Sequence, residues 1–183
     1  TNSTIRDNNG SAVGGAISTA PNASTILLNS LIANNRGGQY SGAIDMNAGT
    51  IWIINSTLSG NQTLSTGAGE GGGAIGGYNT ATLTIINSTI TSNSSPAPNT
   101  SRSGIWLESG TLTIANSIVA NNNGANNCLN MGTRIDNGCN LDNGTSCGFS
   151  GVVGQNTNPL LGALENNGGP TLTHALLSNS PAV

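Results

Sequence analysis

Hydrophobic and polar residues alternate along this chain in short segments that return at regular intervals. Four such segments, TILL, IWII, LTII and LTIA, each end directly before an asparagine. Alternation with a period of two is typical of a strand with one buried face. We therefore expect an inward-facing core stack, built from the residues that share one position in these segments: Leu27, Ile53, Ile85 and Ile114.

A second element, N-S-x-[I/L/V]-x-x-N, follows each of these segments and also opens the chain. Its copies return every 26 to 32 residues, and they begin at Asn2, Asn29, Asn55, Asn87 and Asn116. Asparagine tolerates left-handed backbone angles, and stacked asparagine amides can hydrogen-bond to one another along an axis. We expect these five asparagines to form a structural ladder at successive turns.

A third element lies between the copies of the second. It reads GGAI at Gly14–Ile17, SGAI at Ser41–Ile44 and GGAI at Gly72–Ile75, with a weaker copy, SGIW, at Ser103–Trp106. Three strand-like segments that recur in a fixed order indicate a solenoid whose coils stack at the inter-strand spacing. The sequence therefore predicts an all-β fold, a parallel β-helix of about five coils. Residues 1–122 form the repeating coils, and residues 123–183 form a Cys-containing loop and C-terminal coils of the same domain.

The composition excludes several classes of protein. Only 6% of the residues are charged, lysine is absent, and four basic against seven acidic residues give a net charge of −3. A protein that tracks nucleic-acid phosphates needs clustered basic residues, so this class is excluded. No run of 18 apolar residues occurs, so we expect no membrane span in this segment. No signal-peptide pattern opens the chain, and we expect any secretion signal to lie outside it.

Two bacterial families share the motifs of this chain. The pairing of GGAI with Φ-x-x-N resembles the repeats of polymorphic outer membrane proteins, which are β-helical surface adhesins, although Ile, Leu or Val stands here in place of their usual Phe. The C-terminal third resembles choice-of-anchor Q domain proteins through the following segments: Asn127-Cys128, Gly138-Cys139-Asn140-Leu141-Asp142, Ser146-Cys147-Gly148-Phe149, Asn158-Pro159-Leu160-Leu161-Gly162, Asn167-Gly168-Gly169-Pro170-Thr171 and Thr173-His174-Ala175-Leu176-Leu177.

The second resemblance implies a secreted, right-handed, pectate-lyase-like β-helix at the cell surface. Such proteins are held there by varied C-terminal anchors, and they have no established common activity. This chain departs from the family at Cys139, where an aromatic residue is common, and it stops at Val183, before the usual Asp-x-Gly.

Three cysteines, Cys128, Cys139 and Cys147, lack both CxxC spacing and histidine partners, which argues against a metal site. In a secreted protein they indicate one disulfide and one free thiol, with three pairings open. The family pattern favours a Cys128–Cys147 disulfide and leaves Cys139 buried where an aromatic residue would pack. An exposed Cys139 would instead be able to link chains.

The acidic residues show no convergent pair. Asp45 follows the Ile position of its GGAI-type segment by one residue and Glu108 by two, so we expect them on opposite faces and roughly 10 Å or more apart. We expect isolated, solvated charges and no catalytic residues. His174 is the only histidine, so no histidine-paired nucleophile is expected.

No metal site and no cofactor are predicted, with one alternative left open. Asp136, Asn140 and Asp142 offer oxygen atoms that suit Ca²⁺. The spacing of a known calcium loop is absent, and turn formation explains these residue types equally well.

We therefore expect the function of an extracellular, non-enzymatic structural or adhesive β-helix. The alternatives are a polysaccharide-active lyase or hydrolase, and a carbohydrate-binding module. Tyr40, Trp52, Tyr78 and Trp106 would form a stacking platform only if they shared a face, and Trp52 and Trp106 lie in different strand segments.

The expected partners are further copies of the chain, a surface carbohydrate, or a host or neighbouring cell. The chain begins inside a coil, and unpaired strand edges recruit other chains, especially where lysine is missing. We expect self-association into filaments or a surface layer, through apolar residues on the outward positions: Ile26, Leu28, Trp52, Ile54 and Ile86.

Overall fold

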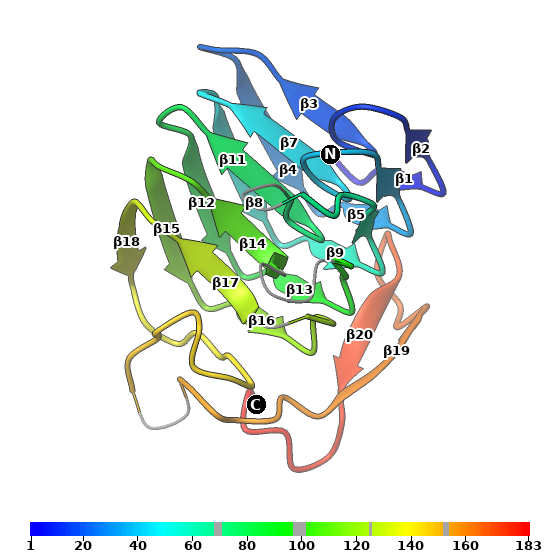
Figure 1. Cartoon of the computed structure of the whole chain (residues 1–183). Helices are drawn as coiled ribbons and strands as arrows, with labels where there is room; N and C mark the ends of the chain where they lie inside the picture. The colour runs from blue at the N-terminus through cyan, green and yellow to red at the C-terminus, as the bar shows by residue number, and fades with distance from the viewer. Residues whose placement is uncertain (68–70, 97–101, 125, 152–153) are drawn as a thin grey trace.

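The protein is a β-solenoid, which confirms the predicted parallel β-helix (Figure 1). The structure is a computed structural model that describes residues 1–67, 71–96, 102–124, 126–151 and 154–183. Within these ranges the secondary structure consists of strands without any helix. No helix that could cross a membrane is present among the described residues.

Three five-stranded parallel sheets form the walls of the solenoid, because each coil contributes one strand to each sheet. Sheet I, formed by the N-S-x-Φ motif, contains β1 (Thr4–Arg6), β5 (Leu31–Ala33), β9 (Thr57–Ser59), β13 (Thr89–Thr91) and β16 (Ile118–Ala120). Sheet II, formed by the GGAI-type segments, contains β3 (Ile17–Thr19), β7 (Ile44–Asn47), β11 (Ile75–Tyr78), β14 (Arg102–Leu107) and β17 (Asn126–Asn130). Sheet III contains β4 (Ser24–Leu28), β8 (Thr50–Ile54), β12 (Thr82–Ile86), β15 (Thr111–Ala115) and β18 (Thr133–Asp136).

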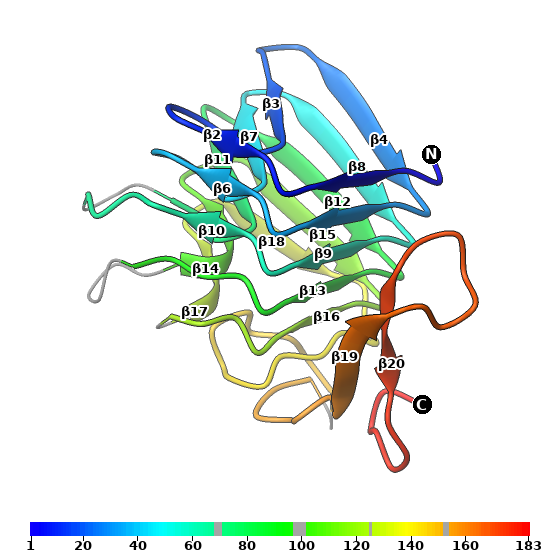
Figure 2. The ribbon, with the colours of Figure 1, turned by 90° about the vertical axis from the view of Figure 1, so that its right-hand side faces the viewer.

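Two smaller sheets complete the fold. A three-stranded ribbon joins sheet I to sheet II, and it contains β2 (Asn9–Gly10), β6 (Arg36–Gly37) and β10 (Gln62–Thr63). An antiparallel hairpin of β19 (Leu161–Glu165) and β20 (Thr173–Leu176) follows the last coil. Figure 2 shows this hairpin against the outside of sheet I, beside β13 and β16. After Asp142 the chain therefore forms loops and a hairpin instead of further coils.

The core is a narrow channel filled by stacked aliphatic side chains. On sheet III, Leu27, Ile53, Ile85 and Ile114 are buried and pair in register, as the alternating pattern predicts. Sheet I contributes the stack of Ile5, Ile32, Leu58, Ile90 and Val119. Sheet II contributes Ile17, Ile44, Ile75, Ile105 and finally Cys128.

An asparagine ladder is present, but it is built mainly from other residues than expected. The opening asparagines of the motif, Asn2, Asn29, Asn55, Asn87 and Asn116, all adopt left-handed φ angles between 49° and 52°. All but the half-buried Asn29 are exposed. Among the described residues, one side-chain hydrogen bond joins consecutive members, from Asn55 Nδ2 to Asn29 Oδ1 (2.8 Å).

The continuous ladder belongs to the closing asparagine of each motif. From Asn8 through Asn35, Asn61 and Asn93 to Asn122, each side-chain amide donates to the carboxamide oxygen of the next coil at 2.8–2.9 Å. Asn122 then donates to Asn127, five residues further along the chain (3.0 Å). Asn35, Asn61 and Asn93 are fully buried, so their amides must be satisfied within the protein. The opening asparagines face solvent, where water satisfies an amide.

The ladder ends at a carboxylate beside the disulfide. Asn127 Nδ2 donates to Asp142 Oδ1, and Asp142 Oδ2 accepts a hydrogen bond from the Cys147 backbone N–H. Cys128 and Cys147 form the predicted disulfide. Cys139 is a free thiol, but it is exposed, so the expectation of a buried Cys139 is wrong. It takes the left-handed turn position that Asn116 holds one coil earlier, with a φ of 55°.

Candidate functional site

The register of β14 determines which side chains share the outer face of sheet II. Ile105 pairs with Ile75, which pairs with Ile44. The alignment of Ser103–Trp106 with GGAI was therefore wrong by one residue. Ile105, and not Trp106, holds the Ile position of this copy, and both residues are apolar, so the sequence alone did not distinguish the two alignments.

A slip of one residue moves a side chain to the opposite face of a sheet. Trp106 pairs with Gly76, which pairs with Asp45, so Trp106 lies in the outward row of Asp45. Glu108 follows the Ile position by three residues, not two, and therefore shares the outer face with Asp45. The expectation that these two carboxylates face opposite sides is wrong.

A groove with a volume of about 370 Å³ runs over this face. Its walls are Val13, Tyr40, Asp45, Asn47, Tyr78, Asn79, Trp106 and Glu108. The lining contains two carboxylates, three aromatic rings and two amides, and no basic side chain is among these residues. Side chains of this mixture can contact a ligand through ring faces and accept hydrogen bonds from its hydroxyl groups.

Three of the four Tyr and Trp residues meet in this groove. The rings of Tyr40 and Tyr78 are in edge-to-face contact at 4.9 Å, and those of Tyr78 and Trp106 at 5.2 Å. Trp52 lies apart on sheet III, as its place in a different strand segment predicts. Tyr40 and Tyr78 are half-buried, whereas Trp106 is only 2% exposed and supports Tyr78 from below.

Asp45 is buried at the base of the groove, so the expectation of a solvated charge is wrong for this residue. Only 3% of it is exposed. Its Oδ1 accepts a hydrogen bond from the Tyr78 hydroxyl, and its Oδ2 accepts one from Ser18 Oγ (3.0 Å). The carboxylate thus fixes the Tyr78 ring against the neighbouring coil, and Glu108 remains the exposed acid of the groove.

Arg102 packs behind the groove and is likewise buried. Its guanidinium carbon lies 4.8 Å from the centre of the Trp106 ring, a cation–π arrangement. Burial lowers the pKa of Arg102, and the nearby charge of Glu108 opposes this effect. Trp106 Nε1 and two guanidinium nitrogens of Arg102 are buried without an acceptor among the described residues.

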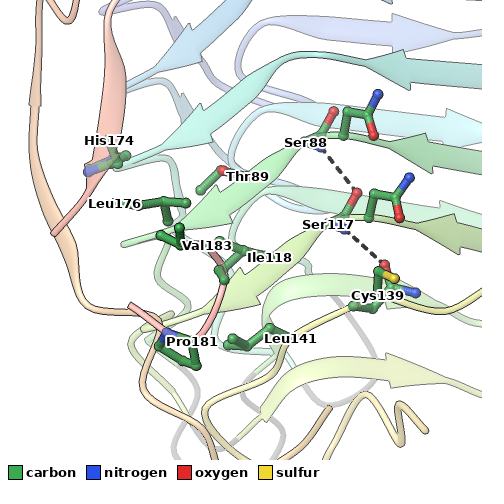
Figure 3. A pocket seen from close by; sticks show the side chains of 14 residues that line it. Ser88, Thr89, Ser117, Ile118, Cys139, Leu141, His174, Leu176, Pro181 and Val183 are labelled. Carbon is green, nitrogen blue, oxygen red and sulfur yellow. Dashed lines mark hydrogen bonds between the residues drawn. The ribbon is translucent and has the colours of Figure 1, made fainter. Parts of the chain in front are cut away.

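A second cleft, of about 570 Å³, separates sheet I from the C-terminal tail. Figure 3 shows Ile118, Leu141, Leu176, Pro181 and Val183 gathered on one side of it, with Cys139 at the opposite side. The backbone N–H of Ser88 donates to Ser117 Oγ, and that of Ser117 donates to Asn140 Oδ1. These hydrogen bonds join neighbouring coils along the cleft. The residues that the C-terminal tail contributes to the lining are apolar: Pro181, Ala182 and Val183.

His174 tethers the hairpin to the solenoid. Its Nδ1 lies 2.8 Å from the backbone oxygen of Gly162, so this nitrogen donates, and its Nε2 lies 2.9 Å from Ser59 Oγ. The pairing of a histidine with a serine was not expected from the sequence, because 115 residues separate the two. Ser59 is buried, so the contact joins two elements rather than presenting a nucleophile to solvent.

Asp136, Asn140 and Asp142 all take part in hydrogen bonds. Asp136 accepts hydrogen bonds from Gly138, Asn140 and Ser150, and Asp142 accepts from Asn127, Gly144 and Cys147. Burial raises the pKa of Asp136, but the hydrogen bonds from Ser150, Asn140 and Gly138 outweigh it and hold this pKa below its ordinary value. In the described part of the chain, no three His, Cys, Asp or Glu side chains are grouped as metal ligands.

The predicted self-association residues all lie on the outer face of sheet III. Ile26 is 60% exposed, and Leu28, Trp52, Ile54 and Ile86 are half-buried. They pair in register across β4, β8 and β12. This apolar patch therefore lies on a different sheet from the groove, whose central residues are on sheet II.

No family model matches the chain, and neither a curated protein nor a solved structure is significantly similar to it.

Proposed function

We propose that this protein is an extracellular adhesive β-helix that binds a carbohydrate in the groove of sheet II. The observation that carries the proposal is the pair of half-buried rings, Tyr40 and Tyr78, which are in edge-to-face contact in a groove whose walls also include one exposed and one buried carboxylate. Sugar rings pack their C–H faces on aromatic side chains, and their hydroxyl groups donate to carboxylates and amides. The groove offers both kinds of contact.

A binding role is favoured over a catalytic one by the state of Asp45. Asp45 is only 3% exposed, and its two oxygens accept hydrogen bonds from Tyr78 and Ser18, so this carboxylate is buried within the protein and holds the groove together. An acid–base pair needs two available carboxylates, and the groove offers Glu108 alone. The Cys128–Cys147 disulfide supports an extracellular location, because disulfides persist in oxidising compartments.

The test is a glycan-binding measurement with the whole chain. We expect binding to at least one class of oligosaccharide on an array, and loss of most of this binding in Tyr78→Ala. Trp52→Ala removes an aromatic residue on the other sheet and should leave binding unchanged. Chromatography of the bound oligosaccharide should recover it uncleaved, and the release of shorter products would favour the enzymatic alternative.

A second proposal concerns self-association through the apolar patch of sheet III. The exposure of Ile26, flanked in register by Trp52, supports it, since exposed apolar patches mark interaction surfaces. We expect the chain to sediment as oligomers at micromolar concentration and Ile26→Asp to shift it to monomers. A wild-type protein that stays monomeric would reject this proposal without affecting the first.

A further inference from the structure

The charge of the groove limits what kind of carbohydrate it accepts. The two residues among its walls that carry a charge at neutral pH, Asp45 and Glu108, are both acidic. Glu108 is exposed and can contact a ligand directly. Arg102 contacts the Trp106 ring and interacts with the charge of Glu108, but it is buried and is not one of the walls. A ligand in the groove therefore meets the Glu108 carboxylate and the half-buried rings of Tyr40 and Tyr78, and both kinds of group attract cations.

A second, independent feature indicates an oxygen-bearing ligand. Trp106 lines the groove, is only 2% exposed, and its Nε1 has no acceptor among the described residues. A buried indole N–H without a partner is costly, and a hydroxyl or ring oxygen of a ligand would satisfy it. A simple ammonium ion offers no such acceptor.

These requirements meet in one class of ligand. We propose that the groove binds an amino sugar with a free ammonium group, as in a de-N-acetylated glucosamine polymer. The ammonium group lies beside Glu108, the sugar face packs on Tyr40 and Tyr78, and an oxygen of the ring accepts from Trp106. This inference rests on the proposed carbohydrate binding and specifies its ligand.

Calorimetry with oligomers of equal length tests the inference. The probes are glucosamine oligomers, their N-acetylated counterparts, galacturonate oligomers and oligolysine, at a mildly acidic pH. We expect glucosamine oligomers to bind about tenfold more tightly than the neutral N-acetylated ones. This preference should shrink at roughly 0.5 M salt, where exposed charges are screened.

Variants assign the preference to a residue. Glu108→Gln should bind the two glucosamine-based oligomers equally, whereas Glu165→Gln, an exposed acid on the hairpin, should keep the wild-type preference. Tighter binding of the neutral or the galacturonate oligomers would overturn the inference. Equal binding of oligolysine would also overturn it, because charge alone would then suffice. The absence of binding to every oligosaccharide would instead reject the proposed function.

Discussion

Asp45 and Trp106 lie in one row of the outer face of sheet II, with Gly76 between them on the intervening strand. Gly76 has no side chain, and the chain at Tyr40 occupies the space that a side chain would take. A Cβ atom at position 76 would lie 2.5 Å from Tyr40 O and 3.3 Å from Ser41 Cβ. The missing side chain thus permits Tyr40 to reach Tyr78.

We predict that Gly76→Ala disrupts the groove while leaving the core intact. Because backbone atoms must shift to admit the methyl group, the free energy of unfolding should fall by about 1–3 kcal/mol. This variant should also bind the oligosaccharide more weakly than the wild type does. Gly169→Ala is the control, since its Cβ would meet nothing closer than 3.7 Å. Unchanged glycan binding in Gly76→Ala would show that Tyr40 is not needed.

The core stack predicts the effect of a buried charge. Ile85 is fully buried between Ile53 and Ile114, so Ile85→Asp places an unpaired carboxylate in an apolar channel. We expect a loss of more than about 4 kcal/mol of stability, enough to abolish the cooperative thermal transition. Thr84→Asp, one residue earlier on the outer face, should melt near the wild-type temperature. Similar melting of the two variants would contradict the assignment of faces.

The two asparagine columns should respond differently to substitution. Asn61→Ala removes a fully buried amide and leaves Asn35 and Asn93 with unsatisfied groups, at a cost of about 3 kcal/mol. Asn55→Ala should cost about 1–2 kcal/mol, because alanine disfavours the φ of 49°.

Substitution by glycine distinguishes the loss of side-chain hydrogen bonds at Asn61 from the strain of the left-handed backbone at Asn55. Asn55→Gly should restore most of the stability lost in Asn55→Ala, since glycine adopts left-handed angles freely. Asn61→Gly should not, because the missing hydrogen bonds are not replaced. Urea unfolding of the four variants gives the comparison, and a rescue of position 61 by glycine would argue against the buried ladder.

The disulfide should contribute to stability as well as indicate the compartment. A bond that closes a loop with a sequence separation of 19 residues is worth on the order of 3 kcal/mol. Mass spectrometry of unreduced peptides should link Cys128 to Cys147 and leave Cys139 alkylated. The double variant Cys128→Ser/Cys147→Ser should unfold at a lower denaturant concentration than the wild type. Three free thiols in the secreted protein would contradict the disulfide.

Acid should weaken the C-terminal loop through Asp136. The folded-state pKa of this carboxyl lies below its unfolded value of about 4. Its contribution to stability is therefore complete above that unfolded value and is lost as the pH falls through the lower folded pKa. We expect Asp136→Asn to be less stable than wild type at neutral pH, with the difference vanishing in strong acid. A difference that persists in strong acid would assign the effect to packing.

The repeated elements of the fold were predictable because each appears several times. Leu27, Ile53, Ile85 and Ile114 hold one position in four copies, and their burial follows from alternation alone. The ladder was predicted as a feature but assigned to the wrong column, since both asparagines of the motif recur equally. Burial distinguishes them, and it depends on which way the turn directs each side chain.

The groove could not be predicted for a different reason. It includes the SGIW copy, which can be aligned with GGAI in two ways, and a shift of one residue in that alignment reverses the face assigned to Trp106 and Glu108. The approach of His174 to Ser59 depends on the return of the hairpin to sheet I. Neither contact repeats along the chain, so no internal comparison exposes it.

The direction of the ladder gives the solenoid a modular length. Every amide from Asn8 to Asn122 donates toward the C-terminus, and the last acceptor is the fixed Asp142. Each inner rung presents the same donor and acceptor to its neighbours, so one rung can replace another. Excising residues 61–92 would bring Asn93 into the place of Asn61 with the hydrogen bonding intact. Rod length can therefore change by whole coils, whereas the carboxylate end stays constant.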